Sequence, residues 1–316
     1  MPLKMLSHRV LFPVCFSILA YFAGSTVLMA SPTDSESVIP GRLVDIGGYR
    51  LHIYCEGNGM PTIIFDSGTG GFSLEWTRVQ KVLSRRTRVC SYDRAGYGWS
   101  DLGPLPRTSE RITRELHTLL DKAEVNGPYI LAGHSFGGYT AQLFARNYPE
   151  ETAGLVLIDA SHPEQIKRFP SREPKIRRQV RPGSHTHHIF RLLLHPDYPE
   201  ENMLTAHRII QSWHHRLTWR EEMNVFTLSA KQVLDSRPMP AVPVVVLTRG
   251  RRVWPHNAYG NEMERVWMEL QDELSQLGAN PVHLIAERSG HMIHLEQPGI
   301  VISAMQTMLD ANFSGE

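Results

Sequence analysis

The stretch Tyr129-Ile-Leu-Ala-Gly-His-Ser-Phe-Gly-Gly138 carries the strongest fold signal in this chain. Apolar residues run into Gly-His-Ser-Phe-Gly, and a segment with helical spacing follows as far as Tyr148. A strand, a sharp turn and a helix in this order form the setting that holds a serine hydroxyl clear of a sheet. Gly133 and Gly137 let strand and helix approach without a Cβ clash. The pattern makes Ser135 a candidate nucleophile; the alternative is a glycine-rich turn with an incidental serine.

Strand-like and helix-like segments alternate on both sides of this stretch. An antiparallel hairpin is predicted over residues 42–56, with its turn at Gly47-Gly48. Further strands are predicted at residues 62–66, 87–92, 154–159, 244–248 and 282–286, and helices at residues 75–83 (with Ser73 as N-cap), 109–123, 260–277 and 298–309. Strands joined through helices give a mostly parallel central sheet with helices on both faces, so the predicted fold class is α/β.

The alternation stops at about residue 162 and resumes near residue 241. The segment between is rich in Arg, His, Trp and Pro, and has helical spacing at residues 205–217 and 220–234 without a strand pattern. The predicted organisation is a linker (residues 31–41), a core in two parts (residues 42–161 and 241–316) and a helical cap or lid (residues 162–240).

Residues 1–30 have the pattern of a targeting segment. Lys4, His8 and Arg9 precede an uncharged apolar run over residues 10–30. Its length approaches the roughly 20 residues that span a bilayer, and its basic start also fits a signal peptide. Either a signal peptide or a transmembrane anchor places the catalytic domain outside the cytoplasm, exported or membrane-anchored, with membrane association through this segment in the second case.

Composition narrows the classes of partner and cofactor. The 316 residues carry a net charge of +1, which gives no reason to expect a nucleic-acid partner. Beside Cys15 in the apolar run, Cys55 and Cys90 lie in the body without a metal or redox spacing. Two buried free thiols are the favoured prediction, with one disulfide as the alternative for an exported domain. The histidine clusters at residues 185–188 and 214–215 lack a catalytic zinc spacing, so no metal and no cofactor is predicted.

A serine hydroxyl needs a base, usually an imidazole held by a carboxylate. Of the sixteen histidines, His291 has the most suitable place, because it follows Ser289-Gly290 after the last predicted strand. In open sheets, catalytic groups gather at the carboxyl ends of the strands. His294 is the alternative base. His134 adjoins Ser135 but is expected to point elsewhere as the turn rotates the chain.

The carboxylate partner is expected at the same edge of the sheet. Asp159 ends the strand after the helix that follows Ser135, which gives the chain order Ser, Asp, His. A helix or turn cap is the alternative role for Asp159. The other acids near this edge are Asp66, Asp93 and Glu262. Asp159 is the predicted acid, and Glu262 and Asp93 stay open as replacements.

An oxyanion hole needs backbone N–H groups, one of them from the residue after the nucleophile. That residue is Phe136. The second donor is expected from the glycine-rich loop at residues 67–71, with Thr69 as the first choice and Gly70 as the second. A turn selected only for its backbone freedom would explain the same glycines.

With these pieces in place, the sequence resembles the α/β-hydrolase superfamily, in its serine esterase and lipase branch, from residue 42 onward apart from the insertion. The motifs that carry the resemblance are Asp93-Arg-Ala-Gly-Tyr-Gly-Trp-Ser100, Gly133-His-Ser-Phe-Gly-Gly138 and Ser289-Gly-His-Met-Ile-His-Leu-Glu-Gln-Pro298. The resemblance implies that Ser135 is the nucleophile, His291 the base and the insertion a cap domain. Most members carry the acid after the strand matching residues 244–248, where this chain has none, and some carry it one strand earlier, where Asp159 falls.

The predicted function is hydrolysis of a carboxylic ester or similar acyl bond of a small molecule, through an acyl-enzyme and without a cofactor. A serine nucleophile in place of an aspartate argues against the epoxide hydrolase and haloalkane dehalogenase branches. Because the pocket selects the bond, the same triad could instead cleave an amide, an N-terminal peptide or a carbon–carbon bond, or transfer the acyl group. A ligand-binding protein on a hydrolase scaffold is the alternative of a different class.

Overall fold

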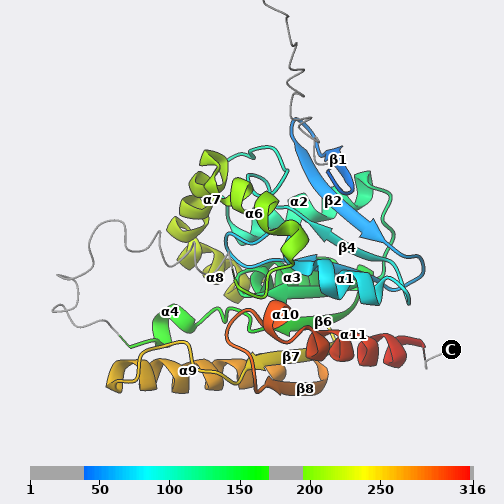
Figure 1. The fold of residues 1–316 in the computed structure, drawn as a ribbon. Coiled ribbons are helices and arrows are strands. Elements are labelled where there is room, and N and C mark those ends of the chain that lie inside the picture. Colours follow the sequence, from blue (N-terminus) through cyan, green and yellow to red (C-terminus); the bar gives the residue numbers. More distant parts are fainter. Residues whose placement is uncertain (1–38, 171–194, 314–316) are drawn as a thin grey trace, which may run out of the picture. The chain divides into compact units, whose positions relative to one another are not determined.

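Among residues 39–170 and 195–313, the ranges that the computed structural model describes, eight strands form one sheet (Figure 1). The strands are β1 (Arg42–Asp45), β2 (Arg50–Glu56), β3 (Thr62–Asp66), β4 (Val89–Tyr92), β5 (Tyr129–His134), β6 (Thr152–Ile158), β7 (Pro243–Arg249) and β8 (Ala279–Ala286). Their order is β1-β2-β4-β3-β5-β6-β7-β8; β2 pairs antiparallel with β1 and β4, and the remaining pairs are parallel. The predicted α/β fold class is confirmed.

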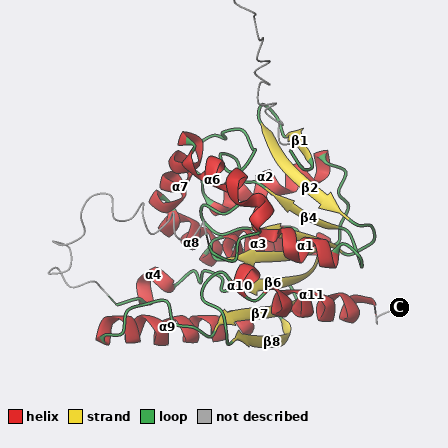
Figure 2. Ribbon diagram, viewed as in Figure 1, coloured by secondary structure: helices red, strands yellow, loops and turns green. Residues whose placement is uncertain are grey.

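The two faces of the sheet are covered by different helices (Figures 1 and 2). One core layer includes residues of α2 (Ser109–Lys122), α3 (Gly137–Asn147) and α9 (Ala258–Ser275), and the other includes residues of α1 (Thr77–Leu83) and α11 (Pro298–Phe313). Leu131 of β5 belongs to the first layer, whereas Ile130 and Ala132 belong to the second, as the alternation of a strand requires. Both faces of β5 are therefore buried, so packing on both sides holds the strand and the start of the turn that follows it.

The predicted helices of the core are present: α2 and α11 begin where predicted, whereas α1 begins two residues later and α9 two residues earlier. The Thr108 side chain accepts a hydrogen bond from the Arg111 N–H and caps α2, and the Asn257 side chain caps α9 in the same way through Gly260. The predicted cap at Ser73 is wrong. Residues Ser73–Trp76 form a 3-10 turn of their own before α1, because the extended backbone residue at its start is Phe72.

The described part of the insertion is helical. Its elements are α4 (Gln165–Arg168), η4 (Glu200–Asn202), α6 (Met203–Gln211), α7 (Trp213–Asn224) and α8 (Phe226–Leu234). The predicted helix over residues 205–217 is broken at Ser212, whose extended backbone ends α6 and whose side chain caps α7 through the His215 N–H. Residues Ala230 and Val233 of α8 pack with Tyr139 and Leu143 of α3. The tract at residues 185–188 lies outside the described residues.

Cys55 and Cys90 form a disulfide, so the favoured prediction of two free thiols is wrong. The two residues lie directly opposite each other on the antiparallel strands β2 and β4, with their Cα atoms 4.1 Å apart. The sequence separates these strands by a third one, so the pairing that opposes the two thiols follows only from the strand order.

The predicted targeting segment at residues 1–30 lies outside the described residues, as does most of the linker after it. Within the ranges that are described, no helix has both the length and the apolar character needed to cross a bilayer.

Candidate active site

Ser135 lies in the turn between β5 and α3 with a φ angle of 51°. This left-handed conformation is uncommon for a residue with a side chain, and such a residue persists where its surroundings determine it. Here the Ser135 N–H donates to the Ile158 carbonyl (3.2 Å), and the Ser135 carbonyl accepts from the Ser161 N–H (2.9 Å). Ser135 is partly exposed between two buried neighbours. The turn therefore presents the serine side chain at the surface of the sheet's edge.

The glycines of the turn are required by close backbone contacts. A Cβ atom at Gly133 would lie 2.4 Å from the Gly137 carbonyl oxygen, and one at Gly137 would lie 2.3 Å from the Asp66 carbonyl oxygen. Backbone atoms cannot yield at these distances without moving β3, β5 or α3. This bears out the close approach expected from the sequence.

Asp159 and His291 are brought together from positions 132 residues apart. His291 Nδ1 lies 2.6 Å from Asp159 Oδ2. The Asp159 carboxylate is fully buried, whereas the His291 side chain keeps 25% of its exposure. Asp159 also has a positive φ angle, 40°, in the residue directly after β6. The two predicted partners of Ser135 thus form one hydrogen-bonded pair whose imidazole reaches solvent.

Arg249 and Trp267 also donate hydrogen bonds to the Asp159 carboxylate. Arg249 Nη1 lies 3.0 Å from Oδ2, and Trp267 Nε1 donates to Oδ1 at 2.8 Å. Burial raises the pKa of Asp159, but the charge of Arg249 and the hydrogen bonds from His291 and Trp267 outweigh it, so the pKa lies below its usual 3.8. Sequence reasoning did not find Arg249, although it ends the strand next to β6 and so lies at the same edge.

His134 connects the serine turn to His291 through the backbone. Its Nε2 lies 2.9 Å from the His291 carbonyl oxygen, and the two rings are 4.6 Å apart. Burial, together with the neighbouring imidazoles, holds the pKa of His134 well below its usual 6.5. The Ser135 hydroxyl has no hydrogen bond to another described residue. The expectation that His134 points away from the hydroxyl fits its bond to the His291 backbone.

The alternative base lies in different surroundings. His294 is fully buried, stacks on Trp76 with 4.3 Å between the ring centroids, and has its Nε2 3.6 Å from Glu75 Oε2. The alternative acids are also engaged elsewhere. Their partners are Arg94 for Asp66 (2.6 Å), His52 for Asp93 (2.8 Å) and the exposed Arg265 for Glu262. Of these candidates, only Asp159 contacts His291.

The glycine-rich loop lies against the serine turn. A Cβ atom at Gly68 would be 3.1 Å from the Ser135 Cβ, so the start of this loop touches the candidate nucleophile. Neither the Phe136 N–H nor the Thr69 N–H donates to another described residue. The Thr69 N–H, the first choice in this loop, is therefore unengaged among the described residues.

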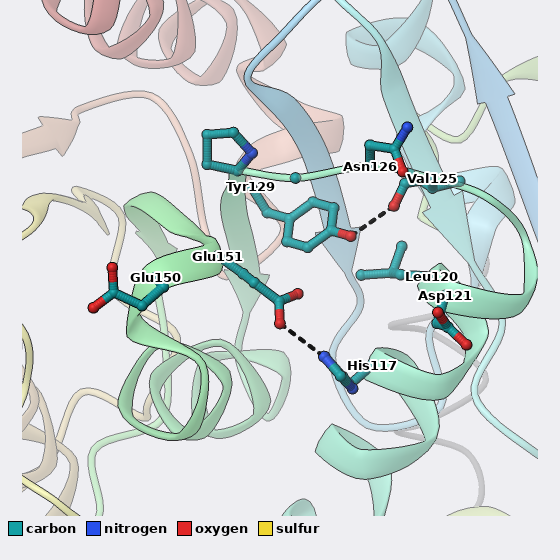
Figure 3. A pocket seen from close by; sticks show the side chains of 10 residues that line it. His117, Leu120, Asp121, Val125, Asn126, Tyr129, Glu150 and Glu151 are labelled. Atoms are coloured by element: carbon teal, nitrogen blue, oxygen red, sulfur yellow. Dashed lines mark hydrogen bonds and ion pairs between the residues drawn. The ribbon is translucent and has the colours of Figure 1, made fainter.

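A pocket of about 490 Å³ lies at the opposite end of β5 (Figure 3). Tyr129, the first residue of the strand, lines it, and the neighbouring His117 Nε2 lies 3.0 Å from Glu151 Oε1. The six residues of β5 separate this pocket from Ser135 by about 20 Å. It is therefore remote from the pair formed by Asp159 and His291.

Comparison with known proteins identifies relatives over most of the core. A family model described as "Alpha/beta hydrolase family" matches residues 63–304. The chain is 35% identical over 153 residues to "Probable transporter efuK" of Hormonema carpetanum, covering 46% of this chain and 22% of that protein. It is 30% identical over 129 residues to the 2-hydroxy-6-oxo-6-(2'-aminophenyl)hexa-2,4-dienoic acid hydrolase of Metapseudomonas resinovorans, covering 40% of this chain and 44% of that one.

A similar structure is the enol-lactonase from Burkholderia xenovorans LB400, with a TM-score of 0.61 and 20% sequence identity over 85% of this chain and 100% of that one. At this identity the likeness concerns the fold alone. The match takes up less than half of the length of both curated relatives.

Proposed function

The chain belongs to the alpha/beta hydrolase family, and from this membership we propose that it cleaves a carboxylic ester or a similar acyl bond with Ser135, His291 and Asp159 as catalytic triad. The observation that carries the proposal is the 2.6 Å hydrogen bond between His291 Nδ1 and the buried Asp159 carboxylate, beside a serine with positive φ. The family and its relatives support hydrolysis as the reaction class.

The hydrogen bond to Asp159 sets the proton positions of the imidazole. The pKa of Asp159 lies below its usual value, so the carboxylate is ionised at neutral pH and can only accept hydrogen bonds. His291 Nδ1 must therefore be the donor, and the neutral ring keeps its lone pair on Nε2. This is the tautomer that can take a proton from the Ser135 hydroxyl.

Acylation begins when Ser135 Oγ attacks the carbonyl carbon and its proton passes to His291 Nε2. Negative charge then develops on the carbonyl oxygen, where the N–H groups of Phe136 and Thr69 would stabilise it. The bond to the leaving oxygen breaks, and that oxygen takes the proton from His291. Ser135 remains acylated and the alcohol departs.

Deacylation repeats these steps with water. His291 takes a proton from the attacking water, the bond between Ser135 Oγ and the acyl carbon breaks, and the proton returns to the serine. The products are a carboxylic acid and the regenerated enzyme, so atoms and charges balance without a cofactor.

Carbon–carbon bond cleavage is the second candidate reaction for the same residues. The observation that favours it is the 30% identity to a protein named as a 2-hydroxy-6-oxo-hexadienoic acid derivative hydrolase. A panel of activated esters, lactones, amides and vinylogous diketones, assayed on one preparation, separates the two candidates by the ratio of their kcat/KM values.

Labelling by a fluorophosphonate tests the triad directly. We expect stoichiometric phosphonylation of Ser135, located by peptide mass, and a burst of product with an activated short-chain ester. Ser135→Ala should lose both while melting at the wild-type temperature. Full activity in Ser135→Ala would sink the proposal, and a wild-type protein that is neither labelled nor active would favour a ligand-binding role.

We propose that the catalytic part is exported or membrane-anchored. The basic start and apolar run of residues 1–30 support this, and so does the Cys55–Cys90 disulfide, since such bonds persist in oxidising compartments. Thiol alkylation of protein taken from intact cells provides the test: both cysteines should resist alkylation unless a reductant is added.

A further inference from the structure

Arg94 joins three parts of the molecule with one buried guanidinium. Its Nη1 lies 2.6 Å from Asp66 Oδ1 at the end of β3, and its Nε lies 2.9 Å from Glu222 Oε1 on α7. Its Nη2 donates to the Gly68 carbonyl at 2.7 Å, and Nη1 also donates to the Ser67 carbonyl. The sheet, the glycine-rich loop and a helix of the insertion therefore meet at a single side chain.

Tyr97 supports the pair formed by Arg94 and Glu222. Its hydroxyl donates to Glu222 Oε2 at 3.0 Å, and the Arg94 guanidinium carbon lies 5.2 Å from the centre of its ring. Gly68 is thus tied to Glu222 through Arg94. The next residue of the loop is Thr69, whose N–H is the proposed oxyanion donor.

Glu222 is needed to position the Arg94 guanidinium more than to neutralise its charge. Arg94, Asp66 and Glu222 are all buried, so the guanidinium stands between two carboxylates. If the Glu222 charge is removed, Asp66 still neutralises Arg94. The guanidinium can then shift toward Asp66, and the carbonyls of Ser67 and Gly68 that it holds must follow it.

We propose that Glu222 of α7 is a positioning residue that sets the place of the Thr69 N–H in the oxyanion hole, through Arg94 and the Ser67 and Gly68 carbonyls that Arg94 holds. The inference rests on the proposed function of Ser135. The chemical step then requires α7 to be packed in place. This helix carries Glu222, and the N–H group that Glu222 positions stabilises the negative charge that develops in the transition state.

Glu222→Gln is the first variant, since it keeps the size of the side chain and removes its charge. We expect kcat to fall by roughly 10-fold to 100-fold, the range for a displaced oxyanion donor, while KM stays within about 2-fold. The rate of phosphonylation by the fluorophosphonate should fall by the same factor as kcat, because its oxygen occupies the same hole.

Glu115→Gln is the matched control. Glu115 is also a buried carboxylate, paired with Arg107 at 2.7 Å, and it has no hydrogen bond to the glycine-rich loop. This variant should melt at a lower temperature than wild type and keep its kcat. A fall in kcat as large as that of Glu222→Gln would show that loss of any buried charge slows the enzyme, and would overturn the inference.

Tyr97→Phe keeps every charge and removes only the hydroxyl that donates to Glu222, so it decides the question if Glu222→Gln does not fold. We expect a smaller fall in kcat with unchanged KM. Wild-type kcat in each folded variant, or a raised KM with unchanged kcat, overturns the inference. These outcomes require a wild-type protein that is labelled at Ser135; an unlabelled wild type overturns the proposed function and this inference together.

Discussion

Arg249 Nη1 lies 3.0 Å from Asp159 Oδ2, at the end of the strand after which most members of the family carry their acid. At the end of β7, where this chain lacks an acid, a cation therefore lies against the carboxylate of the residue that follows β6. Its guanidinium also packs over the rings of Trp254 (4.5 Å) and Trp267 (4.9 Å) and lies 3.0 Å from Glu264. The cation at β7 and the carboxylate after β6 form one buried unit, and their roles can be separated by substitution.

Asp159→Asn should lower kcat strongly while the protein remains folded. The amide can no longer stabilise an imidazolium and can hold His291 in the wrong tautomer, an effect that reaches about 10⁴-fold in serine proteases. Steady-state kinetics on an activated ester provide the measurement. Asp101→Asn, which removes a carboxylate paired with the exposed Arg50, is the control and should keep its activity. A near-wild-type rate in Asp159→Asn would return Asp93 and Glu262 to consideration.

Arg249→Gln should lower the free energy of unfolding. Loss of one partner leaves the Asp159 charge without its cation in a buried site, which costs about 3–5 kcal/mol. In the double variant with Asp159→Asn, the loss of stability should be clearly smaller than the sum of the two single losses, whereas activity should stay as low as in Asp159→Asn alone. Urea unfolding of the four proteins checks this, and strictly additive losses would show that the two groups do not interact.

The acid side of the stability curve should depend on His215. Burial lowers the pKa of this residue from 6.5 to about 4, and its ring nitrogens have no hydrogen-bond partner in the described part of the chain. Between these two pH values the unfolded chain binds a proton that the folded protein does not, so stability falls as the pH falls, by about 3 kcal/mol in all. Above pH 6.5 this group contributes no pH dependence.

His215→Phe keeps the ring against Tyr97 and Phe72 and removes the titrating group. The variant should lose less stability than wild type between pH 6.5 and pH 4, measured as the difference in unfolding free energy at each pH. The exposed His256 offers a control substitution, which should leave the wild-type curve unchanged. Identical curves for His215→Phe and wild type would contradict the prediction.

Loss of the disulfide should lower stability without removing activity. The Cys55–Cys90 bond closes a loop of 35 residues, for which the chain-entropy model gives about 3–4 kcal/mol. The Cys55→Ala/Cys90→Ala variant should unfold at a lower urea concentration than oxidised wild type, and reductant should shift only the wild type. Activity should persist because both cysteines lie away from Ser135 in the sheet. They are on β2 and β4, and β3 separates β4 from β5, the strand that leads into the serine turn. If reductant leaves the wild-type midpoint unchanged, the bond does not contribute as expected.

The sequence by itself determined the succession of strands and helices along the chain in the core, and the turn that carries Ser135. These features depend on residues close together in the chain: the period of apolar residues in β5 and α3, and the glycines at positions 133 and 137. The helical character of the insertion was also predicted, whereas the break at Ser212 was not, because a serine within a helical period is read as a surface position until its backbone is known.

Only the tertiary structure decided which distant groups meet. Asp159 reaches His291 across 132 residues and Arg94 reaches Glu222 across 128, and the disulfide depends on β2 pairing with β4 instead of its sequence neighbour β3. Strand order and register are set by the packing of the whole sheet, and a local apolar period does not contain them. The sequence could therefore predict Ser135 as nucleophile and His291 as base, and could prefer Asp159 among several candidate acids. The partners of that acid, and the link from α7 to the glycine-rich loop, could be found only from the fold.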